Sequence, residues 1–166
     1  LLNDFKTTRL NELTSETKSF FSKLSGYDTL RLILCKKAIL VEGDSDELIV
    51  QKAYMDANAN SLPIVNGIDV ISVGTSFLRF LEIAKKINKP VVVVTDNDSN
   101  PDAVKKKYNA YLGKNTVDTI KICYDESVDT GLLMIDDAKF NYNTLEPKIL
   151  KVNSLGLFNK VFGKAY

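Results

Sequence analysis

The sequence predicts an α/β protein built on a mostly parallel, doubly wound sheet with helices on both faces. Short apolar stretches of strand length alternate with longer amphipathic stretches of helical period, and one short stretch is an unbroken run of four valines, residues 91–94. A β-branched run without alternation is typical of a central parallel strand covered on both sides. At 166 residues, with 45% hydrophobic and 26% charged residues, the chain has the size and composition of one soluble globular domain.

Along the chain, each predicted element is bounded by turn residues such as Gly, Pro, Asn and Asp. The amphipathic stretches place apolar residues three or four positions apart, as a helix with one buried face requires. We expect strands at residues 38–41, 68–73, 91–94, 119–123 and, shorter, 131–135. We expect helices at residues 4–24, 28–34, 44–58, 77–87, 101–112 and within 154–163.

The first of these strands ends at Glu42 and Gly43, where the chain turns into a helix. In open α/β sheets ligands bind at the carboxyl ends of the strands, so Glu42 is a candidate for chemistry. Asp44 and Glu47 have the spacing of a capping box, in which Asp44 accepts from the first amides and Glu47 reaches back to it. Asp46 is not needed for that cap and is expected to remain free for a metal ion.

A second acidic pair follows the valine strand. Asp96 and Asp98 are two residues apart at the end of a predicted extended segment, so their side chains are expected to leave on the same side. A bound cation relieves the repulsion between carboxylates this close, and Mg²⁺ or Mn²⁺ suits an all-oxygen site. Strand-to-helix turns also favour these residue types for purely structural reasons.

If the two strand ends are neighbours, the two acidic pairs converge and can hold two ions. Two ions activate a water on one side and stabilise the leaving oxygen on the other, which is the logic of phosphodiester cleavage. The converging carboxylates would be Glu42, Asp46, Asp96 and Asp98.

The composition excludes several other classes of chemistry. The sequence contains no histidine, so Ser-His and Cys-His nucleophiles are excluded, and the isolated Cys35 and Cys123 offer no zinc site and are expected to be buried thiols. The net charge of +1 neither requires nor excludes a nucleic-acid partner. No apolar run approaches the roughly 20 residues of a membrane span, and no export leader is present, so we expect no membrane partner and a cytoplasmic location.

The two acidic motifs together resemble a Toprim domain, the Rossmann-like fold that topoisomerases, primases and OLD-family (overcoming lysogenization defect) nucleases share. Val-Glu-Gly-Asp-Ser-Asp at residues 41–46, after one predicted strand, and Thr-Asp-Asn-Asp at residues 95–98, after another about fifty residues on, carry the resemblance. Three further segments are similar to the OLD family: the helix before the first strand, residues 72–77, and Asn-Thr-Leu-Glu-Pro at residues 143–147. The resemblance covers about residues 27–150.

This resemblance implies a metal-dependent DNA endonuclease or nickase that works with Mg²⁺ or Mn²⁺, with two ions expected, in phage defence or DNA repair. It implies that the two acidic pairs named above are catalytic and bind the metal. Glu146 matches a late glutamate and is expected to be an extra metal ligand; the alternative is that it caps a helix started by Pro147. The residues expected to contact the substrate, for which turn chemistry is the alternative, are Gly43, Ser72, Gly74 and Thr75.

OLD proteins carry an ABC-type ATPase before the Toprim part, and this chain contains no Gly-x-x-x-x-Gly-Lys-Ser/Thr phosphate loop. The resemblance therefore implies an ATPase domain in the same parent chain, joined through a helix in residues 1–26. Residues 27–150 would form the Toprim domain and residues 151–166 a truncated C-terminal segment. The family also uses a lysine beyond the late glutamate, for which the candidates are Lys148, Lys151, Lys160 and Lys164.

Two alternatives remain open from the sequence. A phosphatase of the haloacid-dehalogenase type would use Asp96 and Asp98 as nucleophile and acid, although that family places the motif on its first strand and would leave Glu42 without a role. A non-catalytic module would bind one structural cation and serve dimerisation or docking. A homodimer is therefore among the expected partners, beside DNA and the ATPase domain.

Overall fold

The computed structural model describes residues 2–3, 6–7, 10–23, 26–135 and 137–163. The chain divides into two compact units. Unit 1 comprises Leu1–Thr95 and Tyr108–Cys123, and unit 2 comprises Asp96–Lys107 and Tyr124–Tyr166. No helix among these described residues is both long and apolar enough to cross a membrane.

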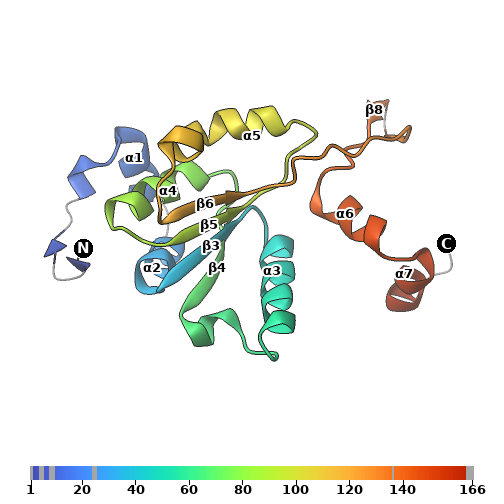
Figure 1. Ribbon diagram of the computed structural model, residues 1–166, viewed down its shortest axis with the longest axis horizontal. Helices are drawn as coiled ribbons and strands as arrows, with labels where there is room; N and C mark the ends of the chain where they lie inside the picture. The colour runs from blue at the N-terminus through green and yellow to red at the C-terminus, as the bar shows by residue number, and fades with distance from the viewer. Residues whose placement is uncertain (1, 4–5, 8–9, 24–25, 136, 164–166) are drawn as a thin grey trace. The chain divides into compact units, whose positions relative to one another are not determined.

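Unit 1 is built on a four-stranded parallel sheet, as the sequence predicts (Figure 1). The strands are β3 (Lys37–Val41), β4 (Ile68–Ser72), β5 (Val91–Val94) and β6 (Ile120–Cys123). Their order is β4-β3-β5-β6, so β3 and β5 are the two inner strands. Leu40 and Val93 are paired in register and both fully buried, which explains why the inner strands are apolar without alternation.

Helices cover both faces of this sheet in unit 1, and Figure 1 shows α3 on one side and α4 on the other. The helices of the unit are α1 (Ser15–Lys23), α2 (Tyr27–Leu34), α3 (Asp44–Ala57) and α4 (Phe77–Lys86). From α4, Phe77, Phe80, Leu81 and Ala84 are buried, which is the spacing of one helical face. Of the two cysteines, Cys35 is buried as expected, whereas Cys123 is exposed because it ends the edge strand β6.

The first predicted helix is shorter than expected. The prediction of residues 4–24 is wrong at its start, since α1 begins at Ser15. Thr14 ends the helix on that side: its Oγ1 accepts from the Thr17 amide at 3.3 Å, and its carbonyl accepts from the Lys18 amide at 3.0 Å. Before it lie β1 (Leu2–Asn3) and β2 (Lys6–Thr7), which pair antiparallel, and a 3₁₀ turn, Leu10–Glu12.

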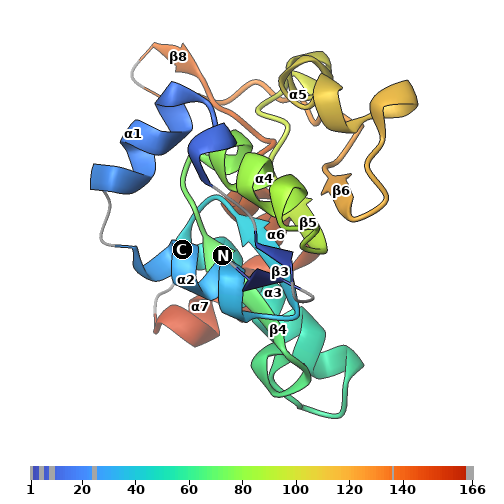
Figure 2. The ribbon, with the colours of Figure 1, turned by 90° about the vertical axis from the view of Figure 1, so that its left-hand side faces the viewer.

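The side chains of α1 pack on α4, and Figure 2 shows the two helices from this side. The Phe21 and Phe80 rings meet edge to face, with centroids 5.3 Å apart. Glu82 accepts hydrogen bonds from the Thr14 amide at 2.6 Å, the Thr14 hydroxyl at 2.9 Å and the Thr17 hydroxyl at 2.5 Å. Burial raises the pKa of Glu82, and these hydrogen bonds outweigh that effect and lower it. An anionic Glu82 thus holds the start of α1 against α4.

Arg31 on α2 connects three elements of unit 1. Its Nε and Nη2 donate to the Asp69 carboxylate on β4 at 3.1 and 2.8 Å, a bidentate pair. Nη2 also donates to Glu47 on α3 at 3.1 Å and to the Val70 carbonyl at 2.5 Å. The hydrogen bond to Asp69 raises the pKa of Arg31 despite its burial, and Glu47 raises it further. Only 20% of the Arg31 side chain is exposed, so loss of this group would leave two half-buried carboxylates without their cation.

Unit 2 contains the remaining elements. These are α5 (Pro101–Lys107), β7 (Met134–Ile135), β8 (Ala138–Lys139), α6 (Leu145–Val152) and α7 (Leu155–Phe162). The helix predicted at residues 101–112 ends at Lys107, and a 3₁₀ turn of unit 1, Asn109–Tyr111, follows. The short strand predicted near residue 135 exists, but it pairs antiparallel with β8 and does not join the main sheet.

We expect Arg31→Met to lower the free energy of unfolding by about 2 kcal/mol or more, because hydrogen bonds to charged groups contribute roughly 1.5–3 kcal/mol and two carboxylates lose their partner. Urea unfolding followed by circular dichroism measures the effect. Lys52→Met is the matched control: it breaks the exposed ion pair with Asp56 and should cost under about 1 kcal/mol. Equal losses in the two variants would contradict a structural role for Arg31.

Candidate metal-binding and active site

The candidate site begins at the carboxyl edge of the unit 1 sheet. Because its four strands are parallel, they all end at this edge. Glu42 directly follows β3, Ser72 ends β4 and Thr95 directly follows β5. Since β3 lies between β4 and β5, Glu42 leaves the sheet with both of these strand ends as neighbours.

The loop after β4 holds the main chain of Glu42. The Glu42 carbonyl accepts from the Ser72 hydroxyl at 3.2 Å and from the Gly74 amide at 3.0 Å. Gly74 has φ of +55°, a left-handed conformation that favours glycine. Three of the residues expected to contact substrate, Ser72, Gly74 and Gly43, thus contribute to the backbone structure around Glu42; the fourth, Thr75, is exposed.

The negative charge of Glu42 affects the pKa of Tyr108, a buried residue of unit 1. Tyr108 is fully buried, and that burial raises the pKa of its hydroxyl; a hydrogen bond with Thr95 lowers it, and the negative charge of Glu42 raises it again. β3 and β5 pair in parallel with Leu40 opposite Val93, so Glu42 and Thr95 follow the ends of two adjacent strands of unit 1. The next residue in the sequence after Thr95 is Asp96.

Asp46, and not Glu47, closes the start of α3. The expected capping frame is wrong by one residue, because Gly43 adopts extended backbone and takes the N-cap position. Asp46 therefore occupies the third helical position, where its Oδ2 accepts from the Gly43 amide at 2.9 Å. A carboxylate has about four acceptor sites, so this one hydrogen bond leaves Asp46 with capacity to bind a cation as well.

Glu47 has a different task from the one expected of it. Its Oε1 accepts from Arg31 at 3.1 Å and from Gln51 at 3.2 Å, and its Oε2 accepts from the Ser72 amide at 3.3 Å. It therefore joins α3 to α2 and to the end of β4. This carboxylate fixes the position of the helix start that carries Asp46.

Asp96 and Asp98 lie in unit 2. Asp98 and Ser99 have φ of +46° and +64°, so Asp98 lies in a tight turn and not on the extended chain that the sequence predicts there. Asn97 causes the turn: its Oδ1 accepts from the Ser99 amide at 2.9 Å, and its Nδ2 donates to the carbonyls of Asp125 and Ser127, each at 2.7 Å. Asn97 is buried and Asp98 is exposed.

The donor set of each unit suits a hard divalent cation. Unit 1 supplies Glu42 and Asp46, and unit 2 supplies Asp96 and Asp98. Across the residues that the structure describes, no group of three or more His, Cys, Asp or Glu side chains is arranged to hold a metal ion. Mg²⁺ keeps several waters and needs only one or two carboxylates, so a pair of acids is a sufficient protein contribution.

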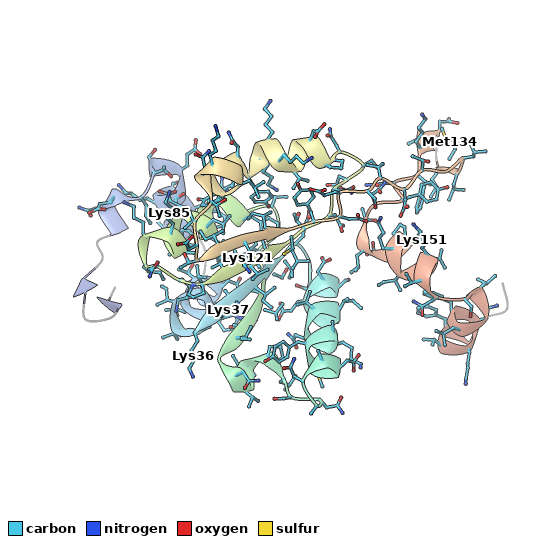
Figure 3. All side chains as sticks on the ribbon, viewed as in Figure 1. Lys36, Lys37, Lys85, Lys121, Met134 and Lys151 are labelled. Atoms are coloured by element: carbon cyan, nitrogen blue, oxygen red, sulfur yellow. The ribbon has the colours of Figure 1, made fainter. Side chains whose placement is uncertain are left out.

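The late residues of the predicted site lie on α6 and near it. Thr144 precedes α6, and Glu146 is exposed in its first turn, so Glu146 does not cap the helix. Lys148 Nζ donates to Asp125 at 2.8 Å and to Asp129 at 2.7 Å, and Lys151, labelled in Figure 3, donates to Asp129 at 2.6 Å. Of the other candidate lysines, Lys160 is exposed and Lys164 lies outside the described residues.

Sequence reasoning missed the two acids that partner these lysines. The hydrogen bonds raise the pKa of Lys148 and lower the pKa of Asp125 and Asp129. Asp125 comes two residues after β6, as Glu42 comes after β3, so its place after a strand was the available signal. Asp129 had none, because its partners are 19 and 22 residues away.

A comparison of the sequence with known protein families identifies the kind of domain that part of the chain forms. Residues 33–98 match the family model described as overcoming lysogenization defect protein-like, TOPRIM domain. The matched segment is therefore a Toprim domain. It is similar to the Toprim domain of OLD-family proteins, as the motifs predict, and it includes both acidic pairs. No curated protein and no solved structure matches the chain.

The match to this family supports a general class of function. An OLD-like Toprim domain is a nuclease-type module that processes nucleic acid, and Toprim domains generally bind Mg²⁺.

The cap of α3 can be tested separately from any metal. Asp46→Ala should lower the free energy of unfolding by about 1 kcal/mol, the usual cost of losing a helix cap, whereas Asp46→Asn keeps an acceptor for the Gly43 amide and should cost much less. Asp44→Ala is the control, since Asp44 contributes only its interaction with the helix dipole, about 0.3–1 kcal/mol. A larger loss for Asp44→Ala than for Asp46→Ala in thermal unfolding would support the original capping frame instead.

Proposed function

We propose that this chain is the metal-dependent DNA endonuclease or nickase module of an OLD-family ATPase-nuclease, and that it hydrolyses phosphodiester bonds. The observation that carries the proposal is the parallel pairing of β3 with β5: Glu42 follows the end of β3, and from the adjacent end of β5 the chain continues through Thr95 to Asp96. Both acidic pairs fall inside the segment that matches the Toprim family.

In this proposal Glu42 and Asp46 bind one side of a two-ion site and Asp96 and Asp98 bind the other. Mg²⁺ or Mn²⁺ bound there would supply an activated water and would stabilise the leaving oxygen of the cleaved bond. Glu146 is proposed as an additional ligand. DNA is the proposed substrate, and an ATPase domain in the parent chain, phage defence or DNA repair, a cytoplasmic location and a homodimer belong to the same proposal.

The chain's own residues would prepare the site before DNA arrives. Ser72 and Gly74 fix the main chain of Glu42, and the Gly43 amide orients the Asp46 carboxylate. Thr75 is exposed beside them and is proposed to contact the DNA backbone. The candidate lysines Lys148 and Lys151 are already paired with aspartates, so either one would have to exchange a carboxylate for a phosphate oxygen to act on DNA.

We expect this chain, joined to the ATPase domain of its parent protein, to convert supercoiled plasmid to the open-circular or linear form with Mg²⁺ or Mn²⁺, and EDTA to stop the reaction. The isolated chain is expected to be weakly active or inactive. Glu42→Gln and Asp96→Asn should each slow it by more than about 100-fold, because loss even of a residue that only orients a metal ligand costs 10–100-fold. Asp102→Asn is the control in unit 2: Asp102 is an exposed residue of α5 and should be dispensable.

The same assay separates the alternatives. Hydrolysis of 4-nitrophenyl phosphate with intact plasmid would favour the phosphatase, and metal binding without cleavage of either substrate would favour the non-catalytic module. Plasmid cleavage that survives both Glu42→Gln and Asp96→Asn would overturn the proposed site.

A further inference from the structure

Two buried asparagines stand beside the turn that carries Asp98. Asn97 and Asn143 are 2% and 1% exposed, and only three polar or charged residues among those described are buried to this degree. Burial of a side-chain amide is costly unless its donors and acceptor are all used. Both asparagines belong to unit 2, as does every partner that they contact.

Asn143 uses its whole side-chain amide. Its Nδ2 donates to the Ser99 hydroxyl at 2.8 Å and to the Asp129 carbonyl at 2.9 Å, and its Oδ1 accepts from the Asp129 amide at 2.7 Å. It therefore joins the turn after Asp98 to the loop that contains Asp129. It also determines the role of the Ser99 hydroxyl, which accepts from Asn143 and must donate elsewhere.

Asn141 receives that donation and contacts the acidic pair. Its Oδ1 accepts from the Ser99 hydroxyl at 3.0 Å and from the backbone N–H of Asn143 at 2.9 Å. Two donors on one atom identify it as the amide oxygen, so the other end of the side chain is the NH₂ group. That NH₂ group faces Asp98 and donates to its Oδ1 at 3.2 Å. The hydrogen bonds thus run in one direction, from Asn143 through Ser99 and Asn141 to Asp98.

We propose that Asn141 is a positioning residue of the candidate site: its side-chain amide holds one carboxylate oxygen of Asp98 and so determines how the other oxygen is presented to a cation. The inference rests on the proposed function for the role of Asp98, but not for the hydrogen bonds themselves. Asp98 is exposed and sits in a left-handed turn, so without this amide its side chain would sample other directions. Hydrogen-bond partners that orient metal ligands typically contribute 10–100-fold to metal affinity or activity.

The test measures Mn²⁺ affinity by isothermal titration calorimetry in the full chain. Asn141→Ala should weaken Mn²⁺ binding by about 10-fold or more, with an unfolding midpoint close to that of the control. Asn153→Ala is the matched control, since the Asn153 side-chain amide, in the same unit, donates to the Ile149 carbonyl of the adjoining helix α6. It should keep the affinity of the parent chain.

A second measurement covers the case in which Asn141→Ala does not fold. In ¹H–¹⁵N spectra of the parent chain, the side-chain NH₂ signals of Asn141 should shift with added Mg²⁺, whereas those of Asn153 should not. A parent chain that binds no Mn²⁺ would overturn both the proposed function and this inference. A parent chain that binds Mn²⁺, with unchanged affinity in Asn141→Ala or unmoved Asn141 signals, would overturn the inference about Asn141 alone.

Discussion

The parallel pairing of β3 with β5 is the constraint on which the rest of the structure depends. Ala38, Leu40 and Val93 are buried in this inner pair, and each such side chain favours folding through the apolar area it removes from water. The pairing brings the ends of two strands together although about fifty residues separate them in the chain. As a result Glu42 and Thr95 follow the ends of two adjacent strands, and the residue after Thr95 is the first acid of the second pair.

Polar side chains then hold the loops that the sheet brings to this edge. Arg31 and Glu47 join α2, α3 and the end of β4, and Asp46 closes the start of α3. In unit 2, Asn97 and Asn143 do the same for the turn of Asp98. In unit 1 the Gly43 amide thus donates to the half-buried Asp46 carboxylate, and in unit 2 the half-buried Asn141 donates to the exposed Asp98 carboxylate.

The sequence predicts the sheet well because its strands are apolar runs bounded by turn residues, a signal that is local. It predicts the ends of elements less well: Gly43 displaces the α3 cap by one residue, and α1 begins at Ser15, eleven positions after the predicted residue 4. It fails on the geometry of Asp98, because the turn is made by hydrogen bonds from Asn97 to Asp125 and Ser127, about thirty residues away. Contacts between distant residues leave no periodic pattern to read.

The proposed function requires Glu42 and Asp96 to bind the same divalent cations, and a double-mutant cycle on Mn²⁺ affinity tests this most directly. Glu42→Gln, Asp96→Asn and the double variant would be titrated with Mn²⁺ beside the parent chain. If the two carboxylates share a site, the double variant should bind little more weakly than either single one, a coupling of about 1 kcal/mol or more. If the two losses simply add, the acidic pairs bind cations independently and the account of a joint site is wrong.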